Sequence, residues 1–139
     1  MRSIQFVGLG LCLASAIAAG PANAVTWPAN IVGTYAGLAN SADIEIIITS
    51  QASAAPCSAI TGSLVDTDQN ITNPIAGYYC PKSGALAFTR SDPTSGQTFQ
   101  VYTGSFEATA KKQSNKLAGA FGEYGDASNL GLYPFFVNN

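Results

Sequence analysis

The phrase Thr61-Gly62-Ser63-Leu64 has near-repeats at Gly33-Thr34-Tyr35 and at Thr103-Gly104-Ser105-Phe106. Each phrase lies in a short run of β-branched, aromatic and small residues, and turn-forming residues separate the runs. Successive runs are 11 to 17 residues apart, a spacing that predicts a β-sandwich or β-barrel rather than alternating strands and helices. Eight antiparallel strands are about the number whose closed sheet can hold one small ligand.

We expect eight strands, over residues 31–37, 44–50, 58–64, 74–79, 85–90, 97–107, 116–123 and 130–137. Short loops join them, so an open sheet would leave two exposed edges, which pairing of the first strand with the last removes. We therefore predict one all-β domain over residues 25–139, an eight-stranded antiparallel up-and-down β-barrel. Pro134 counts against its strand, because proline lacks a ladder donor and belongs at an edge or a bulge.

Residues 1–24 have the pattern of a secretory signal peptide. Arg2 supplies a positive charge, residues 4–19 are apolar, and Ala22-Asn23-Ala24 is an A-x-A cleavage site. The apolar run is short for a membrane span, and no stop-transfer pattern follows it. We therefore expect a mature chain that begins at Val25, is secreted or periplasmic, and has no membrane partner.

Cys57 and Cys80 are the two cysteines that follow residue 24, and we predict that they form a structural disulfide. If residues 58–64 and 74–79 form an antiparallel hairpin, positions whose numbers sum to about 137 face each other. Gly62 then opposes Ile75, and the cysteines oppose each other closely enough to bond. Closing this loop is worth about 3 kcal/mol on the chain-entropy estimate.

Charge and residue types exclude several classes of function. Without Arg2 the chain has five basic and eight acidic residues, a net charge of −3. Its basic cluster (Lys111, Lys112, Lys116) is expected in a solvated loop, so we predict no nucleic-acid partner. Histidine is absent from the sequence, as are a G-x-S-x-G elbow and a metal-ligand motif, so we predict no enzymatic activity, metal or cofactor. Asp66 and Glu123 are the acids with a chance of facing inward.

Five phrases, in order and at matching spacings, resemble the avidin family of biotin-binding barrels across residues 31–137. They are Val32-Gly33-Thr34-Tyr35, Ile60-Thr61-Gly62-Ser63-Leu64, Gly84-Ala85-Leu86-Ala87-Phe88, Val101-Tyr102-Thr103-Gly104-Ser105-Phe106 and Leu130-Gly131-Leu132-Tyr133-Pro134-Phe135. The resemblance implies the same eight-stranded barrel, with a small-molecule site in its mouth and biotin as the possible bound ligand.

Carried over position by position, the resemblance implies nine ligand-site residues: Ser41, Leu64, Asp66, Phe88, Thr98, Gln100, Tyr102, Phe121 and Tyr133. Ser41 matches the family's ureido-binding serine, and Thr98 is a conservative match to a contact with the carboxylate tail. Phe88, Tyr102 and Phe121 stand where family members use tryptophan to wall the bicyclic ring.

Several polar contacts of the family are missing from this sequence. Gly37 replaces an asparagine, Leu64 and Asp66 replace a tyrosine and a serine, and Tyr133 replaces an aspartate. The tryptophan that a neighbouring subunit supplies has no counterpart in residues 125–129. Each buried polar group left unpaired costs about 1–3 kcal/mol, so we expect weak biotin binding or a related small ligand.

Alternatives remain open for the aromatic residues and for the function. Phe88, Tyr102, Phe121 and Tyr133 could all fill the barrel as ordinary core and leave no cavity. The chain could also be a secreted interaction module, like the bacterial metalloprotease inhibitors, with residues 25–29 as the segment inserted into the protease. Trp27 is more simply explained as packing across a closed end of the barrel.

Strand six also carries apolar residues on the face expected to point outward, namely Phe99 and Val101. Exposed apolar rows on a barrel often mark a subunit interface. We therefore predict a homo-oligomer, either a dimer or a tetramer.

Overall fold

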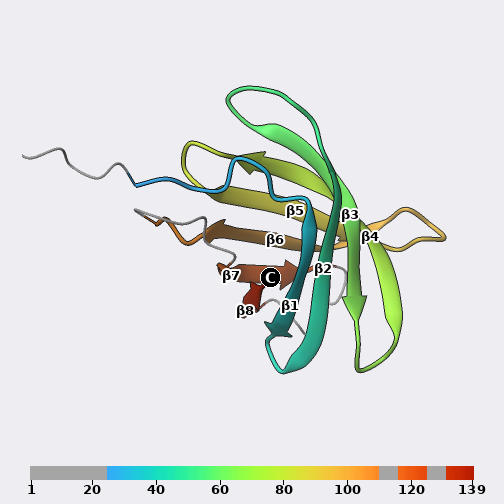
Figure 1. Ribbon diagram of the computed structural model, residues 1–139. Helices are drawn as coiled ribbons and strands as arrows, with labels where there is room; N and C mark the ends of the chain where they lie inside the picture. The colour runs from blue at the N-terminus through green and yellow to red at the C-terminus, as the bar shows by residue number, and fades with distance from the viewer. Residues whose placement is uncertain (1–24, 110–115, 125–130) are drawn as a thin grey trace, which may run out of the picture.

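A computed structural model describes residues 25–109, 116–124 and 131–139, which form a closed antiparallel barrel (Figure 1). Its strands are β1 (Gly33–Ala39), β2 (Ala42–Gln51), β3 (Ser58–Asp66), β4 (Ile71–Cys80), β5 (Ala85–Ser91), β6 (Thr98–Phe106), β7 (Lys116–Glu123) and β8 (Leu132–Asn138). Each strand pairs with the next, and β8 pairs with β1. The predicted up-and-down barrel is confirmed.

Three expectations fall outside the described residues: the signal segment 1–24, the lysines at 111 and 112, and residues 125–129. Within the described part of the chain, no helix is long and apolar enough to cross a membrane.

The β3–β4 hairpin has the register that the cysteines require. Gly62 pairs with Ile75, and the disulfide between Cys57 and Cys80 joins Cα atoms 4.1 Å apart. Both the register and the disulfide were predicted, and both are confirmed. Such a bond is typical of an oxidising compartment outside the cytoplasm.

Pro134 lies at the point where β8 leaves its ladder with β1. The two strands pair only as far as Ala39 and Phe135, and the carbonyl of Pro134 accepts a hydrogen bond from the Asn40 N–H at 2.7 Å. The N–H that proline lacks would therefore fall beyond the last pair of the β1–β8 ladder. A barrel strand tolerates proline at such a position.

The observed β1 starts two residues later than expected, because side-chain acceptors bind the two preceding N–H groups. The Ile31 N–H donates to Oε1 of Gln51 at 2.9 Å, and the Val32 N–H donates to Oδ1 of Asn30 at 2.9 Å. The Ile31 side chain is fully buried. The chain thus crosses the end of the barrel here instead of joining the sheet.

The core is the inside of the barrel, and inward residues alternate with outward ones along each strand. Glycine recurs on the inward face where neighbouring strands approach closely. A Cβ at Gly62 would overlap the carbonyl oxygen of Ile47, and one at Gly77 would overlap that of Ala87. Close approach therefore explains the glycine in the phrase Thr61-Gly62-Ser63.

Residues 26–31 cover the end of the barrel where β1 begins, which we call the N-terminal end. Tyr79 Oη donates to the Pro28 carbonyl at 2.6 Å, and Thr26 forms a β-bridge with Thr109. The Trp27 ring packs on Gly84 and against the core, as expected for a residue that closes the barrel. The opposite end, where β3, β5 and β7 finish, is the polar end.

Candidate functional site

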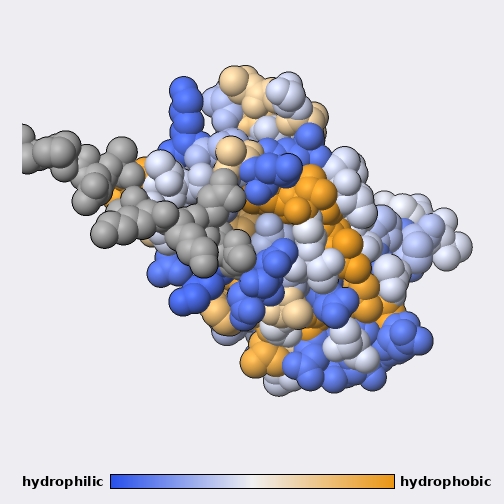
Figure 2. Space-filling view, in the orientation of Figure 1, coloured by the Kyte–Doolittle hydropathy of each residue, from blue (hydrophilic) through white to orange (hydrophobic). Residues whose placement is uncertain are grey.

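Five neighbouring strands direct a polar side chain inward at the polar end. These residues are Asp66 on β3, Asn73 on β4, Arg90 on β5, Gln100 on β6 and Glu123 on β7. The first four are at most 8% exposed. Each lies two positions along its strand from a buried apolar or aromatic residue, so strand alternation places it on the same inner face. Figure 2 shows hydrophilic residues over the adjacent β1–β2 and β3–β4 turns.

We call these five inward side chains the polar layer, and Arg90 forms its centre. Its Nε and Nη2 both donate to Oδ1 of Asn73, at 3.0 and 2.7 Å, and its Nη1 donates to Oε1 of Gln100 at 3.0 Å. Tyr102 Oη donates to the same Gln100 oxygen at 3.1 Å, while Gln100 Nε2 donates to Oε1 of Glu123 at 2.6 Å. Gln100 therefore links the guanidinium to the Glu123 carboxylate.

The guanidinium charge is held by neutral oxygens rather than by a direct ion pair. Among the described residues, no carboxylate lies within ion-pair distance of Arg90. Three of its five N–H groups donate to amide oxygens, and the guanidinium also forms a hydrogen bond with the Tyr102 hydroxyl. The centroid of the Phe99 ring lies 5.2 Å from Cζ of the guanidinium. Asp66 accepts a hydrogen bond from the Gln69 N–H at 3.0 Å, which ties it to the β3–β4 turn.

The Tyr102 hydroxyl remains protonated in this setting. Its pKa is raised to about 12, mainly by burial; the Arg90 charge and hydrogen bond lower the pKa, and the Glu123 and Asp66 carboxylates contribute smaller increases. Both carboxylates are therefore within electrostatic reach of the hydroxyl. The polar layer thus combines one guanidinium and two carboxylates, beside a neutral phenol.

Aromatic rings fill the barrel directly beneath the polar layer. Phe88 stacks on Tyr102 with ring centroids 4.7 Å apart, and Tyr102 stacks on Phe121 at 4.8 Å. All three are at most 5% exposed. The structure brings together the three rings expected to wall a ligand, but it packs them against one another, so no ligand ring fits between them. Tyr133 continues the row of rings toward the polar end. It is half-buried, and its ring centroid lies 5.4 Å from that of Phe121.

The remaining expected site residues lie away from this cluster. Leu64 is fully buried in the core. Thr98 is exposed at the rim, where its Oγ1 lies 3.1 Å from Oγ of Ser91. Ser41 is exposed in the β1–β2 turn, and its side chain forms no hydrogen bond with a described residue. Neither Ser41 nor Thr98 forms a side-chain hydrogen bond with Arg90 or Gln100.

Sequence reasoning missed Arg90 and Asn73, although alternation contained the signal. Arg90 follows the inward Phe88 by two residues, and Asn73 precedes the inward Ile75 by two. Phe99 was expected to point outward, but a register shift after Arg90 leaves it without a β5 partner, and its ring packs over the guanidinium instead.

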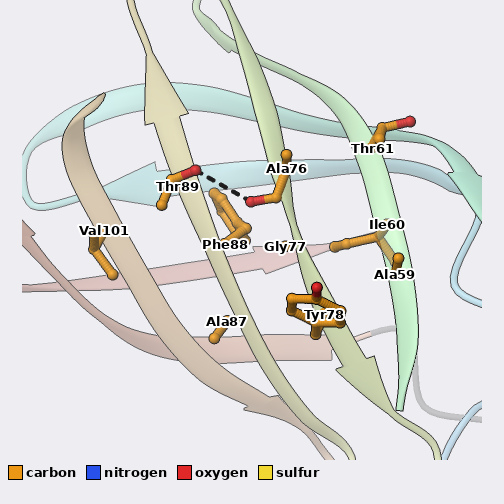
Figure 3. A pocket seen from close by; sticks show the side chains of 10 residues that line it. All are labelled: Ala59, Ile60, Thr61, Ala76, Gly77, Tyr78, Ala87, Phe88, Thr89 and Val101. Atoms are coloured by element: carbon orange, nitrogen blue, oxygen red, sulfur yellow. Dashed lines mark hydrogen bonds between the residues drawn. The ribbon is translucent and has the colours of Figure 1, made fainter. Parts of the chain in front are cut away.

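A hollow of about 500 Å³ lies on the outer wall of the barrel (Figure 3). Its lining comes from four consecutive strands: Ala59, Ile60, Thr61, Ala76, Gly77, Tyr78, Ala87, Phe88, Thr89 and Val101. Thr89 Oγ1 donates to the Ala76 carbonyl across its floor at 3.3 Å. This outer hollow shares only Phe88 with the expected ligand residues, so it is separate from the polar layer.

The described residues contain no group of three histidine, cysteine or acidic side chains that could hold a metal ion. Comparison with protein-family models, with curated proteins and with solved structures returns no match for this chain.

Proposed function

We propose that this protein is a barrel that binds a small molecule at its polar end, with biotin as the first ligand to test. The observation that carries this proposal is the environment of Arg90. The Arg90 guanidinium is nine-tenths buried, and it is held by two amide oxygens and the Tyr102 hydroxyl, with no carboxylate of the described residues in ion-pair contact. Burying such a charge is costly unless its hydrogen bonds are completed.

The surrounding groups favour a ligand that has both donors and acceptors. A ligand carbonyl oxygen could accept a hydrogen bond from the Arg90 guanidinium, while adjacent ligand N–H groups could donate to Asp66 or Glu123. A cyclic urea, as in biotin, has this arrangement. An apolar portion of the ligand would pack on Tyr133, because the rings beneath the polar layer are already stacked on one another.

Export is part of the proposal. The pattern of residues 1–24 and the disulfide between Cys57 and Cys80 both support a secreted or periplasmic protein. The protease-inhibitor alternative has less support, because residues 26–31 are attached to the barrel. Hydrogen bonds to Pro28 and Ile31, together with the packing of Trp27, would have to break before this segment entered a protease.

Calorimetric titration of residues 25–139 with biotin, at about 100 µM protein, tests the proposal. We expect saturable heat with a dissociation constant in the micromolar range or weaker, because several polar contacts of the avidin family are missing. Absence of both heat and a thermal shift would remove biotin as the ligand.

A matched pair of variants tests the site. Glu123→Gln keeps the shape of the side chain but removes a carboxylate from the polar layer, and we expect at least tenfold weaker binding. Glu45→Gln makes the same change on β2, outside the barrel, and we expect no effect on binding. Equal affinities of the two variants would contradict binding at the polar end.

A further inference from the structure

The outer wall formed by β3, β4, β5 and β6 carries no charged side chain. We call this surface the neutral face, and its outward residues are Ala59, Thr61, Ser63, Val65, Thr72, Pro74, Ala76, Tyr78, Ala85, Ala87, Thr89, Ser91, Val101, Thr103 and Ser105. Charged residues make up 10% of the whole chain, and those in the described residues lie inside the barrel, in turns or on other strands. Depletion of charge, with an exposed tyrosine, is typical of the centre of a protein–protein interface.

The neutral face is also shaped to receive a side chain. Alanine and glycine at positions 59, 76, 77 and 87 leave the outer hollow of about 500 Å³ (Figure 3). Tyr78 stands at its edge and is 63% exposed. A hollow and a projecting ring therefore lie side by side on one surface, which is the arrangement that an isologous pair requires.

Charge indicates which partner suits this face. The chain from Val25 onward has a net charge of −3, and acidic residues such as Asp43 and Glu45 lie on the outer side of β2. In a two-fold dimer the same surface of each copy forms the interface. A charged surface would therefore meet the same charge on the partner and be repelled. The neutral face is a surface on which a second copy meets no such repulsion. We propose that it is a homodimer interface in which Tyr78 of each copy enters the hollow of the other.

The size of the neutral face predicts a weak dimer. Four strands about 4.8 Å apart, with about six residues each at roughly 3.3 Å, give a projected area of roughly 400 Å² per copy. Standard stable interfaces bury about 800 Å² per partner. Association should therefore depend on concentration. Val101 lines the hollow, as expected of an interface residue, whereas Phe99 belongs to the Arg90 cluster instead.

Sedimentation equilibrium of residues 25–139, from about 10 µM to about 1 mM, tests this inference. We expect the mass to rise toward that of a dimer across this range. Ala87→Arg places a charge in the hollow, and we expect a monomer at every concentration. Tyr78→Ser should weaken association at least tenfold. Both positions are exposed, so circular dichroism of each variant should match the unmodified chain.

Ala36→Arg is the matched control, because Ala36 is an exposed alanine on β1, on the opposite side of the barrel. It also lies beside the exposed cross-strand pair of Leu38 and Phe136, which is a competing apolar patch. We expect this variant to dimerise normally. A monomeric unmodified chain at the highest concentration, a dimeric Ala87→Arg variant or a monomeric Ala36→Arg variant would each overturn the inference. None of these outcomes bears on ligand binding at the polar end.

Discussion

One oxygen of Asn73 accepts two hydrogen bonds from Arg90, from Nε at 3.0 Å and from Nη2 at 2.7 Å. A neutral amide thus provides the main fixed contact of a buried cation on the neighbouring strand. Removing one partner of a buried charge costs more than replacing both with apolar groups, because the remaining charge loses its compensation. The stability of the polar end should therefore depend on the two residues jointly.

Asn73→Leu should lower the free energy of unfolding by about 3 kcal/mol, because it leaves the Arg90 guanidinium buried without its main acceptor. Adding Arg90→Met should recover part of this loss. Urea denaturation of both single variants and the double variant gives the coupling energy. If the two losses simply add within about 0.5 kcal/mol, the side chains are not energetically coupled.

Replacing both Cys57 and Cys80 by serine should lower the free energy of unfolding by about 3 kcal/mol, because the bond closes a 23-residue separation and restricts the unfolded chain. Denaturation of the oxidised protein and of the double variant measures the difference. Equal midpoints would show that the unfolded chain gains little freedom when the bond is lost.

Stability should fall at high pH as two tyrosines ionise. Burial raises the pKa of Tyr79 to about 12, with a smaller contribution from neighbouring Tyr35, and burial likewise raises that of Tyr102 to about 12. Both ionise near 10.0 in the unfolded chain. The unfolded state therefore releases protons that the folded state holds. The contribution of these two tyrosines to stability is fully present below about pH 10 and is lost as the pH rises toward 12. At pH 11 each tyrosine should cost about 1 kcal/mol.

Urea denaturation between about pH 8 and about pH 11 measures this loss, and Tyr79→Phe is the control. The variant loses the hydrogen bond to the Pro28 carbonyl, which should cost about 1 kcal/mol at neutral pH. Between about pH 8 and about pH 11, the free energy of unfolding of this variant should fall by less than that of the unmodified chain. The same pH dependence in both proteins would assign the effect to other groups.

Gly62→Ala should destabilise the barrel by about 3 kcal/mol, because the added Cβ overlaps the Ile47 carbonyl of the neighbouring strand. Gly122→Ala is the matched control on β7, where a Cβ would lie 3.4 Å from the Leu132 side chain, an ordinary contact. Thermal unfolding of both variants tests the difference. A cost at Gly62 no greater than that at Gly122 would show that the strands can separate to admit a methyl group.

The fold was predictable because its determinants are local or involve neighbouring strands. Alternation gives the inner and outer faces, turn residues give the strand ends, and the two cysteines fix the β3–β4 register. Even the contact between β1 and β8 followed from the cost of two open edges. Pro134, which counted against a paired strand, is tolerated because the β1–β8 ladder ends beside it.

The candidate site was only partly predictable, because it depends on how the strands are staggered around the barrel. Alternation places Asn73 and Arg90 inside, but whether their side chains meet depends on the register of the β4–β5 ladder, in which Ile75, and not Asn73, lies opposite Arg90. Whether Phe88, Tyr102 and Phe121 line a cavity or stack on one another likewise depends on the width of the closed barrel. The sequence by itself determined the strands, the disulfide and the inner face. Only the tertiary structure decided which inner side chains touch, because those contacts depend on the register between neighbouring strands and on the width of the closed barrel.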